Sequence, residues 1–327
     1  MTDLGNGIWA SDTALRLGPS VDAIVFDVDG VLLNVSGSFR KCISATTQFF
    51  LAKTLGWEGG GEYLPVSETE LFKRAGGFNN DWSLAECAIL LFLCKGTAAD
   101  GTSAALLRAL PPSTAEYTAE IGRRGGGEDN AVACLTDAFP ADIIQIARAL
   151  WDKDVIDRIF MEMYAGRTHC KRVYGFEPTL VDQERGELLN ETVLLDTPAL
   201  TDRYRYGIVS GRLRGELDVA LEMTGLRGLI DRAATMTADD GLHKPDPNGL
   251  IVLADRMSFA AAAFVGDTLD DMRTVHNYRK VRTEPGYLAC QVLSGPAGEA
   301  NRQFFADHGA DVVAPDVNAL MRWFESL

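Results

Sequence analysis

The stretch that decides the fold reads Ala-Ile-Val-Phe-Asp-Val-Asp-Gly over residues 23–30. Its short apolar run, residues 24–26, is typical of a central strand that is covered on both faces. Asp27 and Asp29 follow, and Gly30 allows the backbone to turn away without a Cβ clash. The carboxyl ends of strands are where open α/β sheets bind ligands. The sequence therefore predicts a functional site at this strand end.

Asp27 and Asp29 are two carboxylates separated by one residue. Side chains alternate along an extended chain, so both should point toward one ligand. Two anions held so close need a cation or a shared proton, and either arrangement suits catalysis. An acidic turn or half of a calcium loop is the structural alternative. Leu32 and Leu33 stand where an EF-hand loop requires oxygen ligands, so the pair favours phosphoryl-transfer chemistry.

Three further segments place ligand-binding groups at the ends of apparent strands. Residues 206–209 lead into Ser210-Gly211-Arg212, which supplies a hydroxyl, an unhindered amide and a guanidinium, all suited to phosphate. Lys244 lies in a proline-stiffened loop, where its ammonium would act as a point charge on phosphate. Residues 261–265 form another buried strand that leads into Gly266-Asp267-Thr268-Leu269-Asp270-Asp271, and its carboxylates suit a magnesium site.

Taken in order, these four motifs resemble those of the haloacid dehalogenase superfamily. The resemblance covers roughly residues 21–34 and 198–316. It implies an α/β fold with a doubly wound, mostly parallel sheet, to which the apparent strands at 288–293 and 311–313 also fit.

The resemblance also implies a role for each motif. Asp27 would be the nucleophile that attacks phosphorus and becomes an aspartyl-phosphate. Asp29 would protonate the leaving oxygen and then activate water. Mg²⁺ would lie between Asp27, the backbone carbonyl of Asp29 and Asp267. Either Asp270 or Asp271 would steady the metal shell or orient Lys244, and the sequence leaves both open.

The residues implied are, as catalytic groups, Asp27, Asp29 and Lys244; as phosphate-binding groups, Ser210, Gly211 and Arg212; and as metal ligands, Asp27, Asp29, Asp267 and Asp271.

An aspartate at position 29 discriminates among relatives, because only a C–O–P substrate needs a proton donor there. We therefore expect a magnesium-dependent phosphatase of a small phosphorylated metabolite. A sugar phosphomutase would carry the same pair and is the alternative. A catalytically dead binding protein would be expected to lack Asp27, Asp29, Lys244 or Asp267, and all four are present. Asn34 stands where many relatives have an acidic residue.

Residues 35–197 are too many for a loop, since structureless loops beyond about 15 residues are uncommon. Helical patterns occur at 39–55, at 85–95 behind a capping box at 83–86, and at 141–164. By resemblance this is a helical cap domain that closes over the site and chooses the substrate; a decorative insertion is the alternative. The catalytic core would then comprise residues 21–34 and 198–327.

Residues 76–82 of the insertion combine glycines, short polar side chains and aromatics. Asn79 and Asn80 are candidate substrate contacts, since amides can both donate and accept hydrogen bonds. Arg40 is a third candidate, as a source of positive charge. The alternative is that residues 79–81 only form a turn and help to cap the following helix.

The composition, 327 residues with 46% hydrophobic side chains, is enough for two domains with cores of their own. A net charge of −15 disfavours nucleic acid and anionic membranes as partners. The densest apolar segment, residues 88–93, is too short to span a membrane. Six cysteines without metal spacing suggest buried, reduced thiols and a cytoplasmic enzyme. Residues 1–20 are no signal peptide and are expected to form an N-terminal tail or an edge extension. The sequence gives no indication of an oligomeric state.

Overall fold

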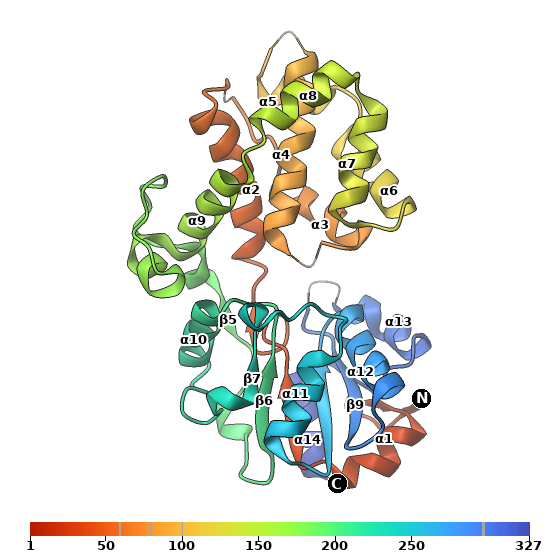
Figure 1. The fold of residues 1–327 in the computed structure, drawn as a ribbon. Coiled ribbons are helices and arrows are strands. Elements are labelled where there is room, and N and C mark those ends of the chain that lie inside the picture. Colours follow the sequence, from red (N-terminus) through yellow and green to blue (C-terminus); the bar gives the residue numbers. More distant parts are fainter. Residues whose placement is uncertain (59, 79, 100, 296–297) are drawn as a thin grey trace. The chain divides into compact units, whose positions relative to one another are not determined.

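The computed structural model describes residues 1–58, 60–78, 80–99, 101–295 and 298–327, and it divides into two compact units (Figure 1). The core unit contains residues 1–35 and 191–327, and the helical unit contains residues 36–190. The expected boundary at residue 198 is too late. Residues 192–193 form a strand that pairs with residues 33–34, so the chain has already rejoined the core unit there.

The core unit is built on one mostly parallel sheet with the strand order β1-β2-β10-β9-β8-β3-β6-β7. The strands from β10 through β9, β8, β3 and β6 to β7 are parallel to one another. β2 pairs antiparallel with β10, and β1 pairs antiparallel with β2. The bounds are β1 Thr2–Asp3, β2 Trp9–Ala10, β3 Ala23–Phe26, β6 Arg205–Val209, β7 Thr235–Met236, β8 Ala261–Gly266, β9 Gly286–Val292 and β10 Val312–Ala314. The predicted α/β fold with a mostly parallel sheet is confirmed, and the strands expected at 288–293 and 311–313 are β9 and β10.

Helices cover both faces of this sheet because the strands carry apolar side chains on both. In β8, Ala263 and Val265 face one core cluster, while Ala262 and Phe264 face the other. The first cluster is completed by α1 Asp12–Leu17, α10 Arg214–Met223 and α14 Val317–Glu325. The second is completed by α11 Asn248–Met257, α12 Leu269–Val281 and α13 Arg302–Asp307.

The register of β3 places its carboxyl end next to the carboxyl ends of β6 and β8. Phe26, the last residue of β3, lies beside Ile208 of β6 and beside Val265 of β8. The strand order reverses direction at β3, since later strands are added first on the β6 side and then on the β8 side. Ligands of open α/β sheets bind at such a switch point, outside the carboxyl ends of the strands.

Residues 1–20 are not a loose tail. β2 extends the sheet antiparallel to β10, β1 pairs antiparallel with β2, and α1 follows with Ser11 as its N-cap. Ser11 accepts a hydrogen bond from the backbone N–H of Ala14 at 3.1 Å. The two strands are each two residues long, too short for an alternating pattern to be visible in the sequence.

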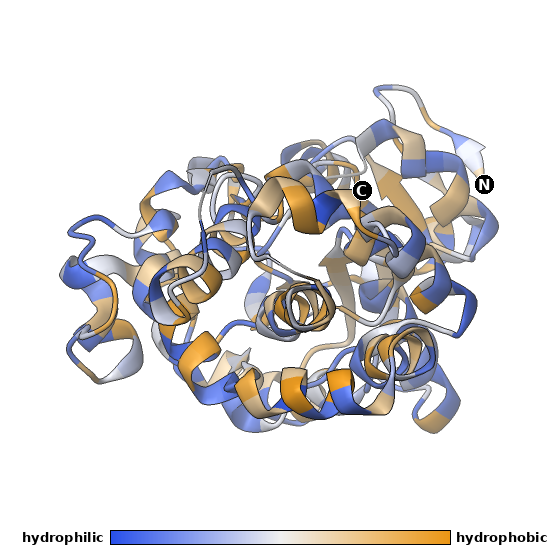
Figure 2. Cartoon of the chain, turned by 90° about the horizontal axis from the view of Figure 1, so that it is seen from above, coloured by the Kyte–Doolittle hydropathy of each residue, from blue (hydrophilic) through white to orange (hydrophobic). Residues whose placement is uncertain are grey.

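The helical unit packs around α4, whose residues 84–95 are buried without interruption. A helix that is apolar on all sides is a core helix. Most other helices of the chain carry both hydrophobic and hydrophilic residues, as Figure 2 shows. The elements are α2 Phe39–Phe49 with a π-helical turn Phe50–Thr54, α3 Val66–Ala75, α4 Asp81–Ala98, α5 Ala104–Ala109, α6 Thr114–Arg123, α7 Gly127–Ala138, α8 Ala141–Leu150, α9 Lys153–Tyr174 and a 3₁₀ turn Glu187–Asn190.

Two helix predictions are wrong in detail. The capping box expected at residues 83–86 lies inside α4, because Asn80 caps this helix by accepting from the N–H of Trp82 at 2.9 Å. The single helix expected over 141–164 is two helices, α8 and α9. Asp152 starts the second by accepting from the N–H of Val155.

The chain leaves the core unit after Val35 and returns at Glu191. The flanking strands β4, Leu33–Asn34, and β5, Thr192–Val193, form an antiparallel pair. The outgoing and returning segments are therefore tied to each other by backbone hydrogen bonds within the core unit.

Candidate active site

Asp27 lies directly beyond the carboxyl end of β3, at the switch point of the sheet. Its backbone N–H donates to the carbonyl of Val265, which continues the pairing with β8 for one more residue. Its carboxylate is buried and accepts from the ammonium of Lys244, with 2.9 Å between Oδ1 and Nζ. The predicted nucleophile is therefore held in place by its backbone and by a cation.

Lys244 bridges two carboxylates in the interior of the site. Its Nζ lies 2.9 Å from Asp27 Oδ1 and 2.6 Å from Asp271 Oδ1. Burial alone lowers the pKa of the ammonium, but the carboxylates of Asp27 and Asp271 outweigh burial and raise its pKa above the usual value. Lys244 is therefore a permanent positive charge beside Asp27.

Asp271 is fully buried and uses both oxygens. Its Oδ2 accepts from the backbone N–H and the hydroxyl of Thr268, at 3.0 and 2.6 Å, in the capping box that begins α12. Its Oδ1 accepts from Lys244. Asp270 forms an ion pair with Arg273 instead, at 3.6 Å. Of the two residues left open by the sequence, Asp271 is the one that orients Lys244.

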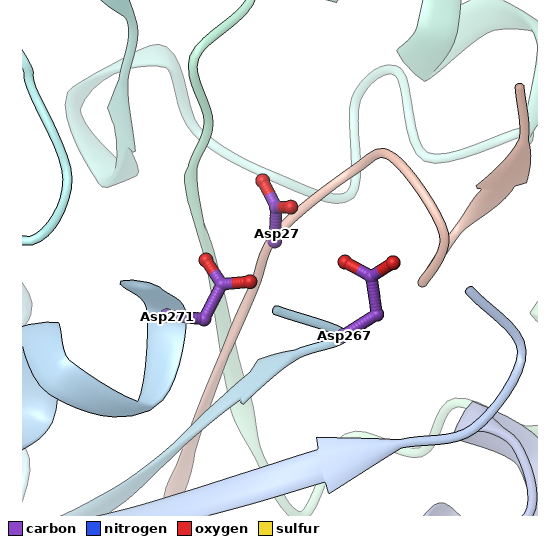
Figure 3. A group of neighbouring side chains, drawn as sticks. All are labelled: Asp27, Asp267 and Asp271. Carbon is purple, nitrogen blue, oxygen red and sulfur yellow. The ribbon is translucent and has the colours of Figure 1, made fainter. Parts of the chain in front are cut away.

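Three carboxylates converge at this strand edge, as Figure 3 shows. Asp27, Asp267 and Asp271 each have an oxygen within 4.8 Å of the others. Burial, followed by the neighbouring carboxylates of Asp271 and Asp27, raises the pKa of Asp267 well above its usual value. The pKa of Asp27 is raised to about 7, chiefly by burial and also by Asp271 and Asp29, although Lys244 lowers it. Oxygen donors that repel one another fit a hard divalent cation, which would relieve the repulsion.

Glycines make room for these carboxylates. Gly30 has a φ of +73°, and a Cβ added there would overlap the carboxylate of Asp267. Gly295 is equally close to Asp267, and Gly266 is equally close to Asp271. The site therefore needs glycine at position 30 for two reasons, backbone conformation and space.

The carboxylate of Asp29 is not one of these three and pairs with Arg212. Arg212 Nε donates to Asp29 Oδ1 at 2.7 Å, and Nη2 lies 2.6 Å from the same oxygen. Arg212 also contacts Glu191, with 2.9 Å between Nη2 and Oε2. The side chain of Asp29 is 34% exposed, whereas that of Arg212 is 2% exposed. Arg212 therefore binds two carboxylates in this structure, and its expected role in phosphate binding stays a prediction.

Ser210 and Gly211 follow β6 at the same edge. Ser210 is fully buried, its backbone N–H donates to the carbonyl of Met236, and its hydroxyl accepts from the N–H of Arg212 at 3.3 Å. Gly211 is exposed, and a Cβ there would meet nothing within 4 Å. The backbone at Gly211 is therefore open to a ligand.

The three candidates from the insertion belong to the helical unit. Arg40 forms an ion pair with Glu70. Asn80 is the N-cap of α4. Asn79 lies outside the described residues.

Sequence reasoning missed two polar residues of the site. Glu191 contacts Arg212 with a side chain that is 1% exposed, yet it lies in a linker without any motif. Ser294, after β9, donates to the carbonyl of Gly30 at 2.6 Å and so supports the turn beyond Asp29. A small polar residue after a buried strand was the only signal for Ser294.

The chain is similar to known proteins in sequence pattern and in fold. A family model described as haloacid dehalogenase-like hydrolase matches residues 21–277. The chain is similar to an X-ray structure determined as a Northeast Structural Genomics Consortium target, with 17% identity, a TM-score of 0.64 and coverage of 94% of this chain and 99% of that one. It is also similar to phosphatase Tt82 from Thermococcus thioreducens, with 21% identity, a TM-score of 0.59 and coverage of 93% and 99%. Because the sequence identities are this low, the two structures support the fold alone. No curated protein matches the chain significantly. Among the described residues, no helix is both long and apolar enough to cross a bilayer.

Proposed function

The chain belongs to the haloacid dehalogenase-like hydrolases, and on that premise we propose that it is a magnesium-dependent phosphatase of a small phosphorylated metabolite. The observation that carries the proposal is the environment of Asp27. A buried carboxylate lies beside a permanent ammonium, at the edge of a three-carboxylate cluster, and a more exposed carboxylate follows two residues later. These are the groups that phosphoryl transfer through a covalent intermediate requires.

In the first half-reaction, a carboxylate oxygen of Asp27 attacks phosphorus and the bond from phosphorus to the ester oxygen breaks. Asp29 gives its proton to that oxygen, so the alcohol leaves neutral. In the second half-reaction, Asp29 takes a proton from water, which attacks the aspartyl-phosphate. Inorganic phosphate leaves, and the carboxylate of Asp27 is restored.

Charge stabilisation must accompany the nucleophile, because phosphate monoester hydrolysis is among the slowest uncatalysed reactions. Lys244 offers a fixed positive charge next to the attacking oxygen, and Gly211, an exposed residue, offers its backbone amide as a donor. Asp27, Asp267 and Asp271, with the backbone carbonyl of Asp29, would hold Mg²⁺. When bound, this ion supplies positive charge for the phosphoryl oxygens.

We also propose that the helical unit chooses the metabolite. The site residues named above supply groups for phosphate and metal, and the resemblance implies that the inserted helical unit recognises the remainder of an organic substrate. Arg40→Ala should then raise KM for the metabolite and leave KM for a simple aryl phosphate unchanged.

A panel of phosphorylated small molecules, incubated with the protein and Mg²⁺, tests the activity. A phosphatase releases one inorganic phosphate for each substrate consumed. A phosphomutase, the second candidate, would consume the substrate and return an isomer without free phosphate. Asp27→Asn, purified in parallel, identifies any phosphate release due to a contaminating enzyme.

A further inference from the structure

The core unit contains a charge network of three side chains, Asp29, Arg212 and Glu191. Arg212 contacts Asp29 through Nε and Nη2, and it contacts Glu191 through Nη2. Exposure of the side chains falls across this network, from 34% for Asp29 to 2% for Arg212 and 1% for Glu191. Only the Asp29 end is accessible to a substrate.

Because Arg212 is buried within the charge network, its charge depends on both carboxylates. A guanidinium removed from water is strongly disfavoured unless carboxylates compensate its charge. Here two carboxylates share one guanidinium, so the removal of either partner leaves a buried charge with less compensation. Arg212 is for this reason restricted to the orientation in which it contacts both.

Backbone hydrogen bonds connect the segments that carry Asp29 and Glu191, the two carboxylates of the charge network. Glu191 directly precedes β5, and β5 pairs with β4. β4 in turn begins at Leu33, whose carbonyl accepts from the N–H of Gly30, next to Asp29. The distance between Glu191 and Asp29 is therefore fixed by the ladder as well as by Arg212.

We propose that Arg212 and Glu191 are positioning residues: Arg212 holds Oδ1 of Asp29, so that Oδ2 is the oxygen that carries the proton and gives it to the leaving oxygen. This inference rests on the proposed phosphatase function. It replaces phosphate binding as the role of Arg212, since a guanidinium already held by two carboxylates and buried to 98% has little capacity left for a phosphate.

Leaving-group dependence distinguishes the two roles. A dinitrophenolate leaves without a proton, whereas a phenolate or alkoxide leaves far better with one, so only the second kind depends on Asp29. For Arg212→Lys, we expect kcat/KM to fall by ~10²-fold or more on phenyl phosphate and by less than about tenfold on 2,4-dinitrophenyl phosphate, following the magnitude of general acid catalysis. Glu191→Gln should show the same pattern with a smaller loss.

Inhibition by inorganic phosphate is the second readout. Competitive inhibition constants should stay within about threefold of wild type for Arg212→Lys, because the phosphate subsite is intact. Arg214→Lys is the matched control, since Arg214 pairs with Asp240 at 2.7 Å and does not belong to the charge network. In addition, Arg212→Lys should cost little when Asp29→Asn is already present, because the two act through one group.

Equal losses on both esters, together with weaker phosphate inhibition, would overturn the inference and return Arg212 to phosphate binding. The proposed function is judged separately. Wild-type protein that hydrolyses neither ester overturns the phosphatase and the inference built on it, whereas Asp27-dependent hydrolysis with an unchanged leaving-group pattern in the variants overturns the inference alone.

Discussion

The ammonium of Lys244 lies 2.9 Å from the carboxylate of Asp27, in a site where both side chains are largely buried. Without this contact, Asp27 would be a carboxylate with two further carboxylates, Asp267 and Asp271, as its neighbours. The ammonium of Lys244 lowers the pKa of Asp27 in an environment that favours protonation, since burial raises this pKa to about 7 even with Lys244 present.

Asp27→Asn should abolish turnover and leave the fold intact. The amide preserves the shape of the carboxylate but cannot form the acyl-phosphate, so kcat should fall by at least ~10³-fold. Phosphate release measures the loss, and circular dichroism with a thermal melt measures the fold. Substantial Mg²⁺-dependent activity in a folded variant would contradict the role of Asp27.

Mg²⁺ affinity should decrease as the pH falls from 8 to 6. Asp27 is protonated below its raised pKa of about 7, and the proton competes with the ion for the same oxygens. Displacement of the Asp27 proton alone predicts about a tenfold weaker affinity at pH 6, and the raised pKa of Asp267 adds to this decrease. Isothermal calorimetry at both pH values, in buffers of different ionisation enthalpy, measures the affinity and the released protons. An affinity that is equal at the two pH values would show that Asp27 is not a ligand.

The same pKa has the opposite effect on metal-free stability. A carboxyl whose folded pKa exceeds its unfolded value near 3.8 contributes stability that is fully present below that value and is lost as the pH rises through about 7. Metal-free protein should therefore melt at a lower temperature at pH 8 than at pH 6. The pH dependence should shrink in Asp27→Asn, which has no proton to lose. Melting curves of both proteins in EDTA provide the measurement.

Gly30→Ala should impair metal binding and catalysis together. The added Cβ would overlap the carboxylate of Asp267, and a misplacement of about 1 Å can cost on the order of 10²-fold in rate. Gly228→Ala is the matched control, because Gly228 has a φ of +90° but nothing within 4 Å of an added Cβ. Both variants should lose roughly 1–2 kcal/mol of stability to backbone strain. Only Gly30→Ala should lose Mg²⁺ affinity, and equal affinities in the two variants would refute the steric argument.

Asn80→Ala should destabilise the helical unit rather than impair substrate recognition. Its side chain caps α4 through the N–H of Trp82, and loss of such a cap costs about 1 kcal/mol. Asn80→Ser should restore most of the melting temperature, since serine caps equally well. A selective loss of kcat/KM on the true metabolite, without a lower melting temperature, would instead support a substrate contact.

Local patterns were sufficient for the longer strands of the sheet and for most of the carboxylate cluster. Asp27 and Asp267 each follow a short apolar strand, so their position at the carboxyl edge of a parallel sheet can be deduced from a few neighbouring residues. The same holds for Lys244 only in part, because its loop position was clear but its two partners were not. The break between α8 and α9 also had a local signal, Asp152 as an N-cap, which the continuous helical pattern concealed.

The roles of Asp271, Arg212 and Glu191 were decided by the tertiary structure. Asp270 and Asp271 are equivalent in sequence, and only the orientation of the first turn of α12 directs one toward Lys244 and the other toward Arg273. Arg212 looks like a phosphate ligand because it follows Ser210 and Gly211, yet its partners come from positions 29 and 191. Strand ends are dictated by hydrophobic periodicity, which acts over a few residues. The pairing of buried charges depends on which carboxylates the folded chain brings within about 3 Å, and residues far apart in sequence make that choice together.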